Sequence, residues 1–168
     1  MIDGQSPPGS WARHLALVEA QGKAKEAPVD MCRSAKWHYD DVSVCQRTKV
    51  GDRWRYPAEI TLQASIVINL RSDFSCMVTA VPNGIWTPSR AARGRAKKEG
   101  VTTGYPDLII DGTGPNAGKV FRAEIKTGAG VSLAQYRVLS ELADAGHDCG
   151  VFRSYGTLAS ALVARGWK

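Results

Sequence analysis

Three side chains, Asp107, Glu124 and Lys126, could act together on a phosphate group. Glu124 and Lys126 lie two residues apart in the segment 119–127, which is typical of a strand, so both side chains should share one face of it. If the strand that begins with "DLII" pairs with this segment, Asp107 at its start lies near Glu124. Two carboxylates a few Å apart repel one another unless a cation lies between them.

A divalent cation is the partner that this pair of carboxylates favours. Mg²⁺ prefers one or two carboxylates together with water and phosphate oxygens, and it polarises a phosphoryl group and acidifies bound water. Lys126 could then position the attacking water or stabilise the charge that builds on the phosphate. A simpler alternative stays open, because aspartate after proline is common in turns and a Glu-x-Lys strand face is often only solvated. A motif this short does not decide between the two.

The segments around these residues alternate between strand and helix patterns. Strands are predicted at 76–81, 107–111, 119–127 and 149–154, and helices at 132–146 and 156–166. On the strand 119–127, Phe121, Ala123 and Ile125 should form a buried face. In the segment 57–73 two periods conflict, because alternating apolar residues slightly favour a strand while Glu59 and Gln63 recur at helical spacing. The order of elements predicts a mixed α/β sheet domain.

The first 56 residues read differently from the rest. Residues 1–10 resemble a mobile arm, 11–25 a helix, and 42–56 a hairpin with Gly51 and Asp52 in its turn. Its aromatic and basic residues, Trp54 and Tyr56 among them, could stack on and pair with a nucleic-acid strand. The favoured interpretation is that the hairpin packs Trp54 on the core.

A strongly basic stretch lies between Ser89, a candidate helix cap, and Gly100, a candidate stop. Only Glu99 opposes its five cations, which are Arg90, Arg93, Arg95, Lys97 and Lys98. A solvated helix face is the ordinary interpretation, and contact with phosphates competes with it. The net charge of +6 suits a polyanionic partner but is weak support alone.

Length and composition predict a soluble protein with a packed core. The 168 residues fit one domain, and 43% of them are hydrophobic. No apolar run reaches the ~18–20 residues of a membrane span, and the start lacks a signal pattern, so a cytoplasmic location is expected. The four cysteines, without C-x-x-C spacing, should be reduced. Zinc at Cys32, His38 and Cys45 is an alternative whose spacing matches no common site.

The C-terminal two thirds resemble the virus-type replication-repair nuclease (VRR-NUC) domain of the PD-(D/E)xK nuclease superfamily. The matching pieces are Gly100, "GYPD" at 104–107, "EIK" at 124–126, Ser132-x-x-Gln135, "AGH" at 145–147 and Arg153-Ser154. Upstream, "VPNG" at 81–84 is similar to the family's turn. The likeness begins near Glu59, which makes 1–56 an N-terminal extension and 57–168 the nuclease domain. Together and in this order, these pieces are specific for the family, although no single piece is specific on its own.

The resemblance implies a restriction-endonuclease-like fold, a mixed β-sheet core flanked by helices. It implies hydrolysis of DNA with Mg²⁺ or Mn²⁺, with branched or flapped DNA as candidate substrates, and a homodimer as a candidate assembly. The metal ligands it implies are Asp107, Glu124 and Glu59, with Lys126 and Gln135 as further catalytic residues. The resemblance favours a helix for 57–73, because the family's corresponding glutamate lies on a helix. It adds Asn83 to the basic stretch as a DNA contact.

Other interpretations of these residues stay open. Ser132 and Gln135 match a capping box, and Glu59 near a helix start is favourable without any metal. Tyr105 departs from the smaller or aliphatic residue expected between glycine and proline. The alternative function is a nucleic-acid-binding, inhibitor or adaptor protein on the same fold that does not cut.

Overall fold

The computed structural model describes residues 25–81, 94, 98 and 100–168. Its elements are α2 (Val29–Arg33), β1 (His38–Tyr39), η1 (Val42–Val44), β2 (Thr48–Val50), β3 (Arg53–Arg55), α3 (Glu59–Asp73), β4 (Cys76–Ala80), β5 (Leu108–Gly112), η2 (Gly114–Asn116), β6 (Val120–Ile125), α5 (Leu133–Asp144), β7 (Asp148–Phe152) and α6 (Tyr155–Ala164). The arm at 1–10, nearly all of the helix predicted at 11–25, and Asn83, Arg90, Arg93, Arg95 and Lys97 lie outside the described residues. Lys98 is described and exposed. In the described ranges, no helix is long and apolar enough to cross a membrane.

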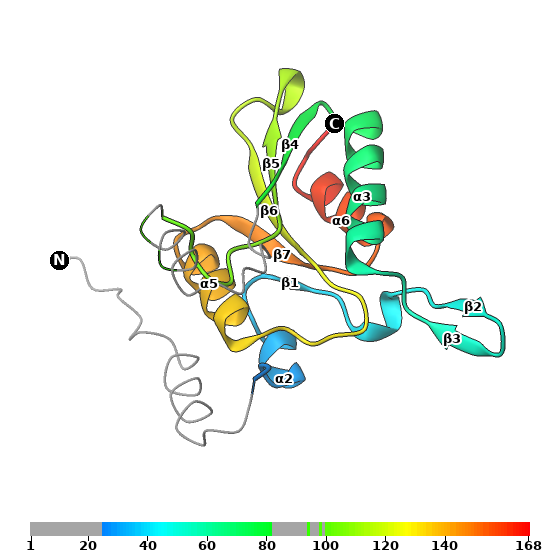
Figure 1. Ribbon diagram of the computed structural model, residues 1–168. Helices are drawn as coiled ribbons and strands as arrows, with labels where there is room; N and C mark the ends of the chain where they lie inside the picture. The colour runs from blue at the N-terminus through cyan, green and yellow to red at the C-terminus, as the bar shows by residue number, and fades with distance from the viewer. Residues whose placement is uncertain (1–24, 82–93, 95–97, 99) are drawn as a thin grey trace.

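Five strands form one mixed sheet in the order β1-β7-β6-β5-β4 (Figure 1). β4, β5 and β6 are antiparallel neighbours, whereas β7 runs parallel to both β6 and β1. Helices α3 and α6 pack on one face of the sheet, and α2 and α5 pack on the other. The predicted mixed sheet flanked by helices is confirmed.

The strand β6 separates two apolar layers. Phe121, Ala123 and Ile125 are fully buried in the layer shared with α3 and α6, as the alternation predicted. Val151 of the neighbouring β7 points into the other layer, against α5. Because side chains alternate along a strand, Glu124 is left on the face opposite Phe121.

The segment with conflicting periods is the helix α3, so the strand favoured by local alternation is wrong and the helix implied by the resemblance is correct. Ile66 and Leu70, one turn apart, are fully buried, which is what a helix packed on a sheet requires. Ile60 and Ile68 are 70% and 68% exposed. The misleading alternation arises because α3 carries apolar residues on its solvent side as well.

Part of the N-terminal segment lies in the central sheet, since β1 pairs with β7 and His38 lies opposite Gly150. The predicted hairpin is present as a separate two-stranded ribbon of β2 and β3. Its predicted start at 42–44 is wrong, because these residues form the 3-10 helix η1. The turn of the ribbon contains Gly51, at the left-handed φ of 60°. Trp54 is 61% exposed, so the expectation that it packs on the core is wrong. The physical reason is that, among the described residues, neither apolar layer includes the two strands of the ribbon. The division of the chain at residue 56 stays a prediction.

Asp40, directly after β1, connects that edge strand to β7 and α6. Its 4% exposed carboxylate accepts hydrogen bonds from His38 Nε2 (2.7 Å), the Arg153 backbone N–H (2.9 Å) and Thr157 Oγ1 (2.5 Å). The Arg153 guanidinium donates in return to the carbonyl oxygens of Asp40 and Thr127. This buried network therefore holds the edge of the sheet to the loop that follows β6.

The Asp40 network is expected to make stability depend on acid pH. Burial alone would raise the pKa of Asp40, but hydrogen bonds from His38, Thr157 and the Arg153 backbone outweigh it and lower the pKa. The pKa of Asp40 in the folded protein is therefore below its unfolded value of about 3.9. Above about pH 3.9 the ionised carboxylate contributes its full stability, and this contribution is lost as pH falls through the folded pKa. Urea unfolding should show the advantage of wild type over Asp40→Asn shrinking as pH drops below about 4. A difference that stays constant with pH would contradict this.

The four cysteines are free thiols, and Cys32, Cys45 and Cys149 are buried. Burial raises the pKa of Cys32 to about 11, although Arg153 opposes the change. Burial likewise raises the pKa of Cys149 to about 12. Thiols with such pKa values stay protonated at neutral pH and pack as small apolar side chains.

Candidate active site

The strands β5 and β6 bring the two predicted carboxylates together. Their register pairs Leu108 with Ala123, which places Asp107, the residue just before β5, beside Glu124. Asp107 Oδ2 accepts a hydrogen bond from the Ile125 backbone N–H at 2.9 Å, so the neighbouring strand fixes the orientation of this carboxylate. Glu124 is only 1% exposed. Both acids therefore lie at the end of β6 that leads to Lys126.

Lys126 joins this pair to α3. Its Nζ lies 2.9 Å from Glu124 Oε1 and 3.5 Å from Oε2 of Glu59, the first residue of α3. Burial alone would lower the pKa of Lys126, but Glu124, and then Glu59 and Asp107, outweigh it and raise the pKa. Lys126 therefore carries a positive charge at neutral pH, between acidic groups from two elements.

Gln135 forms the predicted cap and also contacts Glu124. Its backbone N–H donates to Ser132 Oγ (3.2 Å), and its Oε1 accepts from the Ser132 N–H (2.9 Å), which completes a capping box. Its Nε2 donates to Glu124 Oε1 at 2.5 Å. The residue that caps α5 therefore also orients the central carboxylate.

Two contacts near the site were not assigned from the sequence. A Cβ on Gly104, at φ 83°, would lie 2.5 Å from the Ala134 carbonyl carbon, so the loop before Asp107 can pack on α5 only with glycine there. Arg122 Nε donates to Tyr105 Oη at 2.7 Å, and Arg122 Nη1 is buried without a hydrogen-bond partner among the described residues. The alternation of side chains along β6 could have indicated that Arg122 lies near the site, because it places Arg122 on the same face of the strand as Glu124.

The negative charge of Glu124 is only partly compensated by Lys126. Burial, followed by the nearby charge of Asp107, raises its pKa to about 8, although Lys126 acts in the opposite direction. Its second oxygen, Oε2, is buried without a hydrogen-bond partner in the described part of the chain. A buried carboxylate oxygen without a donor is unfavourable unless a cation binds it.

A divalent cation fits this donor set. Asp107 and Glu124 supply two carboxylates, and Mg²⁺ commonly takes one or two, with water and substrate oxygens as its other ligands. Among the residues that the structure describes, no three or more His, Cys, Asp or Glu side chains are grouped as a metal site, whether here or at the cysteines considered for zinc. Water and substrate oxygens are the usual further ligands of Mg²⁺ at such a pair of carboxylates.

The structure brings five of the predicted site residues together, Glu59, Asp107, Glu124, Lys126 and Gln135. Their catalytic and metal-binding roles stay predictions. Of the predicted DNA contacts, only Lys98 is described, and it is exposed.

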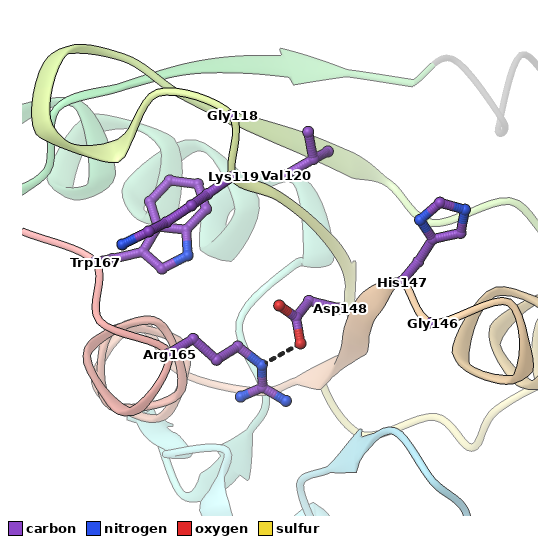
Figure 2. A pocket seen from close by; sticks show the side chains of 8 residues that line it. All are labelled: Gly118, Lys119, Val120, Gly146, His147, Asp148, Arg165 and Trp167. Atoms are coloured by element: carbon purple, nitrogen blue, oxygen red, sulfur yellow. Dashed lines mark hydrogen bonds and ion pairs between the residues drawn. The ribbon is translucent and has the colours of Figure 1, made fainter.

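A separate pocket of about 380 Å³ lies at the other end of β6 (Figure 2). It is lined by Gly118, Lys119, Val120, Gly146, His147, Asp148, Arg165 and Trp167. Arg165 Nε contacts Asp148 Oδ1 at 2.5 Å, and Lys119 Nζ donates to the Gly166 carbonyl oxygen. Because these cations already have partners and lie away from Glu124, the pocket is not part of the candidate active site.

A solved structure supports the fold. A protein described as a "VRR_NUC domain protein" matches with a TM-score of 0.51 and 22% sequence identity, over 66% of this chain and 88% of that one. The fold is nuclease-like. At this identity the likeness establishes the fold and not the activity. No family model and no curated protein matches the chain.

Proposed function

We propose that the protein is a Mg²⁺- or Mn²⁺-dependent nuclease that hydrolyses phosphodiester bonds in DNA. The observation that carries the proposal is the buried Glu124 carboxylate, which has an oxygen without a donor, Asp107 beside it and Lys126 Nζ at 2.9 Å. Two carboxylates and an ammonium at a strand end suit a metal-bound phosphate. The likeness of the fold to a VRR_NUC domain protein supports the same proposal.

The contacts of each residue support a role in this proposal. A divalent ion held by Asp107 and Glu124 would supply Lewis-acid stabilisation of the phosphate and acidify a bound water. The Lys126 ammonium can donate a hydrogen bond to the attacking water or to the phosphate oxygen on which charge builds. Glu59 holds that ammonium at 3.5 Å, and Gln135 orients Glu124.

The direct test is cleavage of end-labelled DNA by the purified full chain. Single-stranded, duplex, branched and flapped substrates should each be incubated with Mg²⁺, with Mn²⁺ and with a chelator. Cleavage that requires the metal is expected. A complete lack of cleavage on all substrates with both metals would reject the nuclease. Metal-independent binding of DNA that is unchanged in Asp107→Asn would instead favour the non-cutting alternative.

The two roles of Gln135 can be separated by a matched pair of variants. Ser132→Ala removes only the cap and should cost about 1 kcal/mol of stability with little change in cleavage. Gln135→Ala also removes the contact to Glu124 and should lower the cleavage rate about 10- to 100-fold, as is typical for groups that orient a metal ligand. Urea unfolding and cleavage rates should be measured on both variants. Equal cleavage rates would show that Gln135 serves only as a cap.

A further inference from the structure

The ribbon of residues 47–56, formed around β2 and β3, presents cations and aromatic rings on one face. Every residue of both strands is exposed. Lys49 lies opposite Trp54 in the register, so these two side chains share a face, and alternation adds Arg47 and Tyr56 to it. The Arg47 guanidinium lies over the Tyr56 ring at 5.7 Å. We call these four residues the ribbon face. In Figure 1 the ribbon extends away from the central sheet.

The charge of the ribbon is one-sided. Its cations are Arg47, Lys49, Arg53 and Arg55, and its one acid is Asp52. Within the described part of the chain, none of these cations forms an ion pair. Exposed cations that form no ion pair attract a polyanion and release its counterions on binding.

The aromatic rings of the ribbon indicate which class of polyanion it binds. Trp54 is 61% exposed and Tyr56 is 37% exposed. A single exposed aromatic residue is ordinary on a protein surface, but here the rings share a face with Lys49 and Arg47. Surfaces that bind single-stranded nucleic acid combine rings for base stacking with cations for the phosphates. Bases paired in a duplex do not offer their faces to a side chain, whereas unpaired bases do.

The base of the ribbon lies at the candidate active site. A Cβ on Gly128, two residues after Lys126, would lie 2.4 Å from Tyr56 Cδ2, so the Tyr56 ring packs on the backbone of that loop. Three residues after Tyr56, Glu59 begins α3 and contacts Lys126. A strand that lies along the ribbon face would therefore reach the loop next to Lys126.

We infer that the ribbon face binds unpaired nucleotides of a nucleic-acid strand. A nucleotide base stacks on Trp54, and Lys49 and Arg47 neutralise the flanking phosphates. The Tyr56 ring, which contacts Arg47 and the Gly128 backbone, fixes the end of the ribbon. The path of this strand to Lys126 rests on the proposed function, and the inference deepens that function by assigning a surface for unpaired nucleotides next to the cut.

The inference is tested by binding in the presence of a chelator, where no cleavage occurs. Fluorescence anisotropy should follow a labelled single strand of about 16 nucleotides and its duplex. Trp54→Ala is expected to weaken single-strand binding about 10-fold or more, and Trp54→Phe to restore most of it. Lys49→Ala should lower the slope of log affinity against log salt concentration by about one, whereas Trp54→Ala should leave the slope unchanged.

Matched controls carry the same kinds of change away from the ribbon. Val163→Ala alters an apolar residue that is 60% exposed on α6, and Lys36→Ala removes a lysine paired with Asp144. Single-strand affinity of Trp54→Ala equal to that of Val163→Ala would overturn the inference. Equal losses of duplex and single-strand affinity in Trp54→Ala would also overturn it. A third contrary outcome is that Trp54→Ala lowers the affinity for polyglutamate as much as that for the oligonucleotide, because polyglutamate has charge but no bases.

Failure of this inference can be distinguished from failure of the proposed nuclease. Wild type that cleaves DNA while the ribbon variants bind normally would reject the ribbon and keep the nuclease. Wild type that binds single strands through Trp54 but cleaves nothing with Mg²⁺ or Mn²⁺ would reject the nuclease and keep the ribbon.

Discussion

Replacing Glu124 by glutamine is expected to lower the rate of DNA cleavage by about 10³-fold without loss of folding. Glutamine keeps the shape of the side chain and the contact with Gln135 can persist, but the negative charge that would bind the cation is gone. Stability should not fall at neutral pH, because burial and Asp107 already raise the pKa of Glu124 to about 8. An uncharged amide therefore resembles the protonated form of Glu124 that this raised pKa favours without metal.

The measurement is the single-turnover cleavage rate, together with thermal unfolding in the presence of a chelator. Glu141→Gln makes the same change at an exposed position of α5 and should cleave like wild type. It also reports on contaminating nucleases, since both variants pass through the same purification. Full activity of Glu124→Gln would remove this carboxylate from the chemistry. A large loss of stability instead would mean that the charge serves the fold.

Replacing Asp40 by alanine is expected to cost about 3–5 kcal/mol of folding free energy. The carboxylate accepts from His38, Thr157 and the Arg153 backbone, and alanine removes the acceptor of all three, including that of the buried Arg153 N–H. Arg153 is 1% exposed and already has one nitrogen, Nη2, without a partner among the described residues. The loss should appear as a lower urea midpoint with an unchanged slope.

The adjacent residue provides the control for Asp40. Asp41 pairs with Arg33 at 2.9 Å, but the two side chains are 41% and 56% exposed. Asp41→Ala should therefore cost no more than about 1 kcal/mol, as is typical of a surface ion pair. Equal costs for the two alanine variants would show that the buried network contributes nothing beyond an exposed pair.

Much of the fold follows from patterns within single elements. Alternation along β6 predicted that Phe121 and Ile125 are buried and that Glu124 lies opposite them, because a strand between two layers must separate its side chains in this way. The capping pattern at Ser132 and Gln135 predicted the start of α5, because its hydrogen bonds join residues close in sequence. Such features depend on local geometry and can be predicted without knowledge of the rest of the chain.

What could not be predicted depends on distant partners. The start of α3 was ambiguous because its exposed face also carries Ile60 and Ile68. β1 has only two residues, and it is held in the sheet by Asp40 and Arg153, which lie 113 residues apart. The exposure of Trp54 reflects that neither apolar layer of the described residues includes the ribbon, and composition carries no such information.

The antiparallel register of β5 and β6 limits how homologous chains can change in length. Asp107 and Glu124 face one another only while Leu108 stays opposite Ala123. A single residue gained within β6 would turn every later side chain to the other face, so that Glu124 would enter the layer occupied by Phe121. Natural insertions and deletions should therefore be absent from these two strands in any lineage that retains the site.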